Sequence, residues 1–125
     1  MSTVTQQHID QAADYIRRNG HVSFPELQRY AESALGMTAS GDYSLEAGPN
    51  LLLWLGMSQE FVDLIHGIQA TRQFDLNPTS LLVYMVDGGV MDLPLAKRPP
   101  RTGYKTPHWA PTVLHPKAAS KASRR

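Results

Sequence analysis

The sequence predicts an α+β domain of three helices and small antiparallel β hairpins, followed by a basic, extended C-terminal tail. Its 125 residues, 42% of them hydrophobic, suffice for one core and fall within the usual range for a single domain, about 100–150 residues. Three segments between residues 6 and 71 carry apolar residues at helical spacing. The apolar runs at 51–55 and 81–86 are short and favour strands.

The distribution of charge divides the chain at about residue 94. Residues 1–94 hold four arginines and all eleven acidic residues, a net charge of −7, whereas residues 95–125 hold eight lysines and arginines and no acid. The apolar segments also precede Pro94, and six prolines follow from that position. We therefore expect a compact acidic α+β domain over 1–94 that folds without the tail. Residues 95–125 are expected to be basic, proline-rich and extended, with a disordered end.

The first two helices are predicted from local signals. The first is expected over residues 6–19, with Gly20 as its stop. The second is expected to start at Ser23, because Ser23-Phe24-Pro25-Glu26 has the form of a capping box, in which hydroxyl and carboxylate each accept from a backbone amide. Its stripe ends at Gly36. The two apolar faces consist of Ile9, Ala12, Ala13 and Ile16, and of Leu27, Tyr30, Ala31, Ala34 and Leu35.

A hairpin and a third helix are expected next. Residues 43–45 are predicted to pair with 51–55, with Gly48-Pro49-Asn50 near the bend and Trp54 as a core anchor. The helix is expected from an N-cap at Ser58 to Thr71, with Phe61, Leu64, Ile65 and Ile68 buried. Gly67 within it costs about 1 kcal/mol relative to alanine, which suggests close packing.

Two or three strands are expected to complete the body. Residues 74–76 alternate apolar and polar side chains, and residues 77–80 turn the chain. The run at 81–86 is predicted to be a buried strand. The glycines of Asp87-Gly88-Gly89 favour a tight turn, from which residues 90–93 would return.

Composition excludes several kinds of site. The absence of cysteine excludes disulfides, thiolate metal ligands and cysteine nucleophiles. The sequence contains no apolar run of about 18 residues, the length that predicts a membrane span. Its first residues have neither the basic start nor the apolar stretch of a secretory signal. These features favour a small cytoplasmic protein that does not contact membranes.

Catalytic and metal-binding patterns are missing from the sequence. It contains no nucleophile elbow, phosphate-binding loop, dinucleotide fingerprint or zinc-protease motif. Asp63 and His66 lie three residues apart on the third helix, but such a pair is more typical of a helix surface. His108 and His115 lie in the tail without a converging set of ligands. We therefore expect no enzymatic activity, no cofactor and no metal.

Residues 17–32, RRNGHVSFPELQRYAE, resemble the end of the first helix, the short strand and the second helix of a winged helix-turn-helix domain. The order of elements over residues 6–93 is similar as well. The resemblance implies that helix three reads the major groove and that Asp87-Gly88-Gly89 is the tip of the wing. Residues 36–57, however, separate helices two and three, where the family has a short turn. Helix three also carries Glu60 and Asp63 and no cation before Arg72, so we expect the tail to supply the phosphate contacts.

The tail combines cations with aromatic residues, which suits either nucleic acid or an acidic protein surface. The leading hypothesis is a non-enzymatic regulatory or accessory protein whose winged-helix-like body contacts nucleic acid mainly through this basic arm. The alternative is a protein–protein adaptor or assembly subunit whose arm docks on an acidic protein surface, which leaves homo-oligomerisation open. A third interpretation is that residues 102–114 fold back over the body. The candidate binding residues are Lys97, Arg98, Arg101, Tyr104, Lys105, Trp109, Lys117, Lys121, Arg124 and Arg125.

Overall fold

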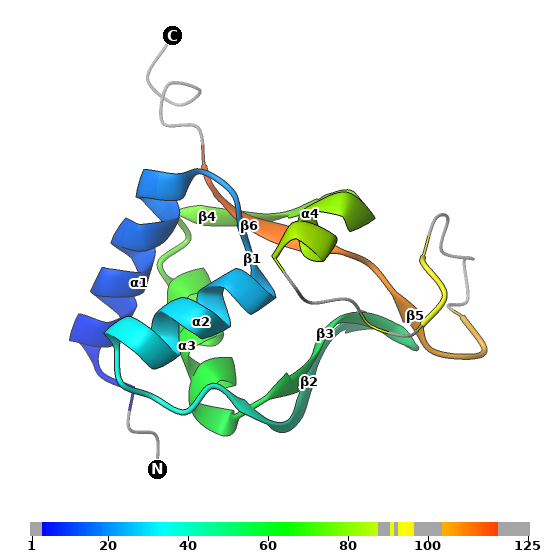
Figure 1. The fold of residues 1–125 in the computed structure, drawn as a ribbon, viewed down its shortest axis with the longest axis horizontal. Coiled ribbons are helices and arrows are strands. Elements are labelled where there is room, and N and C mark those ends of the chain that lie inside the picture. The colour runs from blue at the N-terminus through cyan, green and yellow to red at the C-terminus, as the bar shows by residue number, and fades with distance from the viewer. Residues whose placement is uncertain (1–3, 88–90, 92, 97–103, 118–125) are drawn as a thin grey trace, which may run out of the picture.

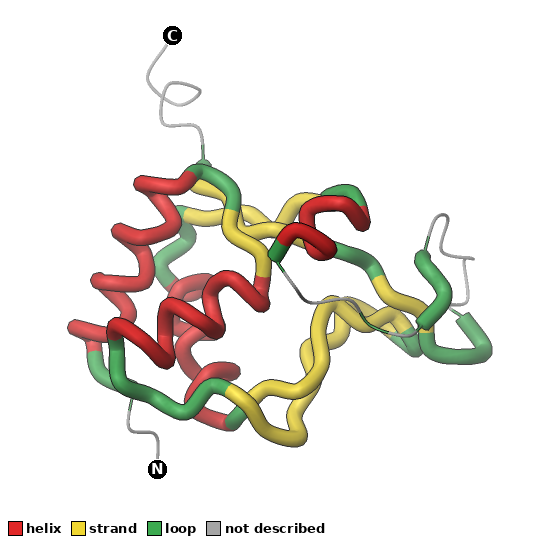
Figure 2. Tube along the Cα trace, viewed as in Figure 1, coloured by secondary structure: helices red, strands yellow, loops and turns green. Residues whose placement is uncertain are grey.

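The computed structural model describes residues 4–87, 91, 93–96 and 104–117. Within them the fold is α+β, as predicted, with four helices and two small three-stranded sheets (Figure 1). Helices α1 to α3 gather at one end of the molecule, and strands β2, β3 and β5 reach toward the other (Figure 2). The helices are α1 (Gln6–Asn19), α2 (Phe24–Ala34), α3 (Gln59–Ala70) and α4 (Leu81–Val86). The strands are β1 (Val22–Ser23), β2 (Ser40–Gly48), β3 (Leu51–Met57), β4 (Phe74–Pro78), β5 (His108–Trp109) and β6 (Thr112–Pro116).

Local signals define the first three helices, and their predicted positions are confirmed. A capping box starts α1, in which Thr5 Oγ1 accepts from the His8 amide at 3.1 Å and the His8 ring accepts from the Thr5 amide at 3.2 Å. Ser23 caps α2 by accepting from the Glu26 amide at 3.3 Å. The predicted return contact from Glu26 is replaced, because its carboxylate accepts from the Tyr15 hydroxyl of α1 at 2.7 Å.

The first sheet has the strand order β1-β6-β4, and both of its pairings are antiparallel. Its central strand, β6, comes from the predicted tail, so the expected domain boundary at residue 94 is wrong for residues 104–117. Residues 112–114 of β6 are buried. Only two of them, Val113 and Leu114, are apolar, and Pro111 and Pro116 flank them, so the segment has no strand period of its own. Pairing with β1 and β4, which are distant in sequence, makes it a strand.

The second sheet has the strand order β2-β3-β5. Strands β2 and β3 form the predicted hairpin, and Asn50 adopts a positive φ of 57° at its bend. Strand β5 lies parallel to β3, with His108 opposite Leu51 and Trp109 opposite Leu52. The same short strand also pairs with Leu95 through a parallel bridge. The segment after Pro94 is therefore attached to the hairpin.

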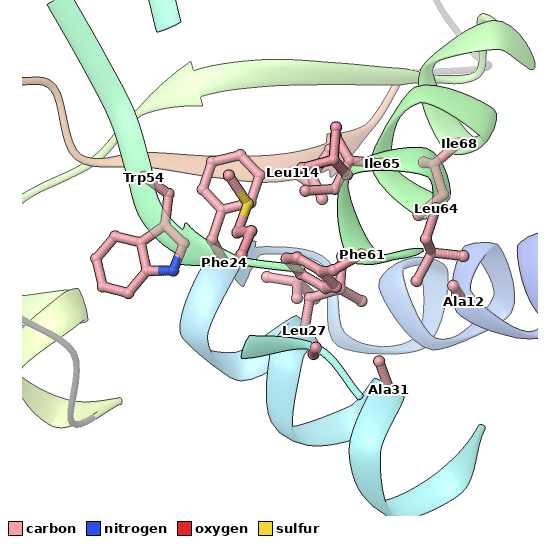
Figure 3. Close-up of a cluster of buried hydrophobic side chains, with 14 of the residues drawn as sticks. Ala12, Phe24, Leu27, Ala31, Trp54, Phe61, Leu64, Ile65, Ile68 and Leu114 are labelled. Carbon is pink, nitrogen blue, oxygen red and sulfur yellow. The ribbon is translucent and has the colours of Figure 1, made fainter. Parts of the chain in front are cut away.

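The core forms where the three long helices meet both sheets. Figure 3 shows side chains of the three long helices together with Leu114 of the first sheet and Trp54 of the second. Trp109 is fully buried, with its ring centroid 5.1 Å from that of Tyr84 and 6.0 Å from that of Trp54. Its indole N–H donates to the Leu53 carbonyl at 3.2 Å. The predicted tail thus supplies two of the fully buried side chains, Trp109 and Leu114.

Residues 81–86 form helix α4 and not the predicted buried strand. Ser80 precedes the helix in extended conformation, and Tyr84 is the helix residue that is buried. A short run that is apolar on every side has no period, so the sequence does not distinguish a strand from one and a half helical turns. Gly88, Gly89 and Val90 lie outside the described residues. Met91 and Leu93, which belong to the expected return strand, lie in no strand.

Gly67 permits the close contact between α1 and α3, as its position suggested. A Cβ atom at Gly67 would lie 2.5 Å from Cδ1 of Ile9 on α1. A second close approach occurs at Gly41 in β2, where a Cβ atom would lie 2.8 Å from Cα of Ser58 and 2.9 Å from the Met57 carbonyl oxygen. These last neighbours are backbone atoms, which cannot move aside as a side-chain end can.

We predict that a chain shortened to end at Lys97 loses its cooperative thermal unfolding transition. Removing β6 leaves β1 and β4 without their shared partner and deletes Trp109 and Leu114 from the core. Circular dichroism at increasing temperature measures this, and a chain ending at Lys117 is the control that should keep the transition. A sharp transition in the shorter chain would show that residues 1–97 fold by themselves.

We predict that Gly41→Ala lowers the free energy of unfolding by about 1–3 kcal/mol, because the new methyl group overlaps backbone atoms. Gly48→Ala in the same strand is the matched control, since a Cβ atom there meets nothing within 4 Å. It should change stability by less than about 0.5 kcal/mol. Urea titration of both variants gives the comparison, and equal effects would argue against this close approach.

Candidate functional site

The candidate binding residues divide between described and undescribed parts of the chain. The described ones are Tyr104, Lys105, Trp109 and Lys117. Lys97, Arg98, Arg101, Lys121, Arg124 and Arg125 lie outside the described residues. For the undescribed cations, the structure places only the described residues that precede or follow them in the chain.

Trp109 belongs to the core and is not available to a partner. Its side chain has no exposed surface and packs against Trp54 and Tyr84. This corrects the expectation that Trp109 binds nucleic acid or an acidic protein surface. The sequence shows a tryptophan among cations and prolines, a pattern that does not distinguish an exposed aromatic residue from one buried by residues far away in the chain.

Residues 104–108 are fixed on the bend of the β2–β3 hairpin. The Asn50 side-chain amide donates to the Tyr104 carbonyl at 2.8 Å, and the His108 amide donates to the Asn50 carbonyl at 2.8 Å. The Tyr104 and His108 rings stack with centroids 3.8 Å apart and planes 15° apart. Lys105 lies exposed between them. The cation is thus carried by a turn that several contacts hold in place.

We call residues 97–105 the basic loop. It contains Lys97, Arg98, Arg101 and Lys105 and no acidic residue. Before the loop, the Ala96 amide donates to the Trp109 carbonyl at 2.8 Å, and the Trp109 amide donates to the Pro94 carbonyl at 2.8 Å. After Gly103, Tyr104 is held by Asn50. The described residues before and after the undescribed part of the loop, Ala96 and Tyr104, therefore lie near β5, which is at the end of the molecule away from α1 (Figure 1).

Lys117 lies at the opposite end of the β5–β6 segment, beside the end of α1. Its backbone amide donates to the Gln73 carbonyl at 2.9 Å, and the Gln73 side chain accepts from the Arg17 guanidinium. The Arg17 guanidinium carbon lies 5.3 Å from the centroid of the Phe74 ring. The His115 ring also contacts His21, with centroids 4.5 Å apart. Lys117, the described residue of the second cation group, is therefore attached to Gln73, the same residue that Arg17 contacts.

Helix α3 presents a polar surface without lysine or arginine. Gln59 and His66 are exposed on it, and Glu60 and Asp63 are half-buried. The Asp63 carboxylate accepts from the Gln59 side-chain amide at 2.8 Å, one turn earlier in the helix. Among the described residues, no group of three or more histidine, aspartate or glutamate side chains is arranged to hold a metal ion.

Helix α4 is joined to the start of α2 by polar contacts of buried and half-buried groups. Ser23 is fully buried, and its hydroxyl donates to the Asp87 carboxylate at 2.6 Å while it accepts from the Glu26 amide. The hydroxyl of Tyr84 donates to the Thr112 carbonyl. Burial raises the pKa of Tyr84 to about 12. Asp87 is a contact that sequence analysis missed, because it interpreted this residue as part of a turn.

We predict that Ser23→Ala costs about 1–3 kcal/mol, because it removes the cap of α2 and leaves an Asp87 oxygen without its donor. Combining it with Asp87→Ala should give a coupling energy of at least about 0.5 kcal/mol in chemical denaturation. Ser58→Ala removes the corresponding cap of α3 and is the control, since Ser58 bonds to Phe61 and Thr38 and not to Asp87. Additive effects for Ser23 and Asp87 would contradict the coupling.

No helix in the described part of the chain is long and apolar enough to cross a membrane. No protein-family model matches the chain, and no significant match is found among curated proteins or solved structures. The residues themselves are therefore the basis for assigning a function.

Proposed function

We propose that this is a non-enzymatic regulatory or accessory protein that binds nucleic acid with a winged-helix-like body. The main contacts come from the basic loop between β4 and β6. The observation that carries the proposal is the attachment of this loop. Ala96, just before it, and Tyr104, near its end, are both hydrogen-bonded to the folded body.

The order of elements supports the winged-helix-like interpretation. Elements α1, β1, α2, α3, β4 and β6 follow one another as helix, short strand, two further helices and an antiparallel strand pair. Strand β1 pairs with the second strand of that pair. The connection between β4 and β6, residues 79–111, then takes the place of the wing. The departure from the resemblance is the β2–β3 hairpin, which stands between α2 and α3.

The charges favour contact through the basic loop and not through α3. Affinity for nucleic acid depends largely on lysine and arginine that neutralise phosphates. Glu60 and Asp63 on α3 repel phosphates, whereas the basic loop carries four cations and no acid. A loop tethered at both ends also loses less conformational freedom on binding than a free tail. Tyr104, partly exposed beside Lys105, offers an aromatic surface for an unpaired base.

We predict that replacing Lys97, Arg98, Arg101 and Lys105 by serine weakens binding to a fluorescein-labelled 20-mer, single-stranded or duplex, by at least about tenfold at low salt. The slope of log K against log salt should become shallower by about 0.7–0.9 per lost phosphate contact. Fluorescence anisotropy at several salt concentrations measures both quantities. The tether makes this loss larger than that caused by the terminal cations.

The matched control replaces Lys117, Lys121, Arg124 and Arg125 by serine, which removes the same charge from the other group. Equal losses for the two variants would indicate attraction by total charge and contradict a site at the basic loop. Absence of salt-dependent binding to either nucleic acid would contradict the proposed function and favour the alternative, an acidic protein surface as the partner of the arm.

A further inference from the structure

Helix α4 presents an apolar outer face that no described element covers. Its exposed fractions are 67% at Leu82, 37% at Val83, 55% at Met85 and 85% at Val86. Elsewhere in the described chain, the large hydrophobic residues with comparable exposure are Tyr43 and Leu55. Single exposed apolar residues are ordinary, but adjacent ones on one surface indicate a contact site.

The inner face of α4 is fixed, so this helix cannot turn its outer face into the core. Tyr84 is fully buried, with its ring centroid 5.4 Å from that of Trp54 and 5.1 Å from that of Trp109. At the end of the helix, the Asp87 carboxylate is bonded to Ser23 and lies 3.9 Å from the Arg29 guanidinium. The outward direction of Leu82 and Val86 is therefore set by the contacts on the opposite side.

A groove runs between this face and the start of α2. It has a volume of about 350 Å³ and is lined by Leu82, Val83 and Val86 of α4, by Asp87 at the end of that helix, and by His21 and Glu26 near the start of α2. This is enough space for one or two apolar side chains, since pockets for small ligands start at about 300 Å³. Three apolar residues and two carboxylates thus line the same hollow.

Two carboxylates line the groove, and one of them, Asp87, also lies 3.9 Å from the Arg29 guanidinium. Glu26 and Asp87 line it, whereas lysine and arginine are absent from its lining. Burial, a hydrogen bond to Glu26 and the charges of Glu26 and Asp87 raise the pKa of nearby Tyr15 to about 12, against the opposing effect of Arg29. A cationic side chain beside an apolar one is the chemical complement of this surface.

We propose that the groove beside α4 is a docking site for an amphipathic segment of another protein, in which apolar side chains alternate with lysine or arginine. The apolar side chains fill the hollow against Leu82 and Val86, and the cations meet Glu26 and Asp87. This site adds a protein partner to the proposed nucleic-acid contact. The lining of the groove contains no residue of the basic loop.

The test uses the full chain and three fluorescein-labelled 16-residue peptides: an amphipathic Leu/Lys helix, its Leu/Glu counterpart and a Ser/Lys peptide of equal charge. We expect the Leu/Lys peptide to bind at least about tenfold more tightly than either of the others, measured by anisotropy. The paired change Leu82→Ser and Val86→Ser should weaken that binding at least about tenfold. The matched control, Tyr43→Ser with Leu55→Ser, removes two exposed hydrophobic residues from the hairpin and should change it less than about twofold.

Three results would overturn the proposal. Equal binding of the Leu/Glu peptide would remove the role of the carboxylates, and equal binding of the Ser/Lys peptide would remove that of the apolar face. A dimer seen by sedimentation velocity, and abolished by the α4 change, would identify a second copy of this chain as the occupant. The basic-loop serine variant should keep its peptide affinity, so failure of the nucleic-acid proposal is distinguishable from failure of this one.

Discussion

Strand β6 is the element on which the rest of the structure depends. It lies between β1 and β4 and pairs with both, so the first sheet exists only through it. Leu114 places an apolar side chain in the common core. The Thr112 carbonyl accepts a hydrogen bond from the hydroxyl of Tyr84 on α4. The two residues before this strand connect it to β5, which holds Trp109 and the ends of the basic loop. The core, the position of α4 and the attachment of the basic loop therefore all depend on the segment that forms β5 and β6.

The two proposed surfaces use the same segment in different ways. The basic loop begins after Ala96, which is bonded to Trp109, and ends beyond Tyr104, which is bonded to Asn50. Helix α4 lies earlier in the same connection between β4 and β6. Its residue Tyr84 points into the core. A long connection between two paired strands thus carries a cationic site and an apolar one, while α3 stays occupied with packing through Phe61 and Ile65.

Sequence reasoning succeeded where the signals are local. Ser23 and Ser58 mark helix starts because a side-chain acceptor acts within three residues, and the β2–β3 hairpin closes over a short bend. It failed at β6 and Trp109, whose burial depends on partners distant in the sequence, such as Val22 for Leu114 and Leu53 for Trp109. Counting charges identified a cationic segment. It could not show that Lys117 and Arg17 both bond to Gln73, because only the folded chain brings these three residues together.

The pairing of Val22 with Leu114 has a consequence for how the protein is made. During synthesis, α1, β1 and α2 leave the ribosome long before the strand that completes their sheet. Until then Phe24, Leu27 and Phe61, which are fully buried in the native protein, lack part of their cover. Contacts between distant segments also slow folding, because a large loop must close before they form. The nascent chain therefore passes through a period in which exposed apolar surface favours aggregation.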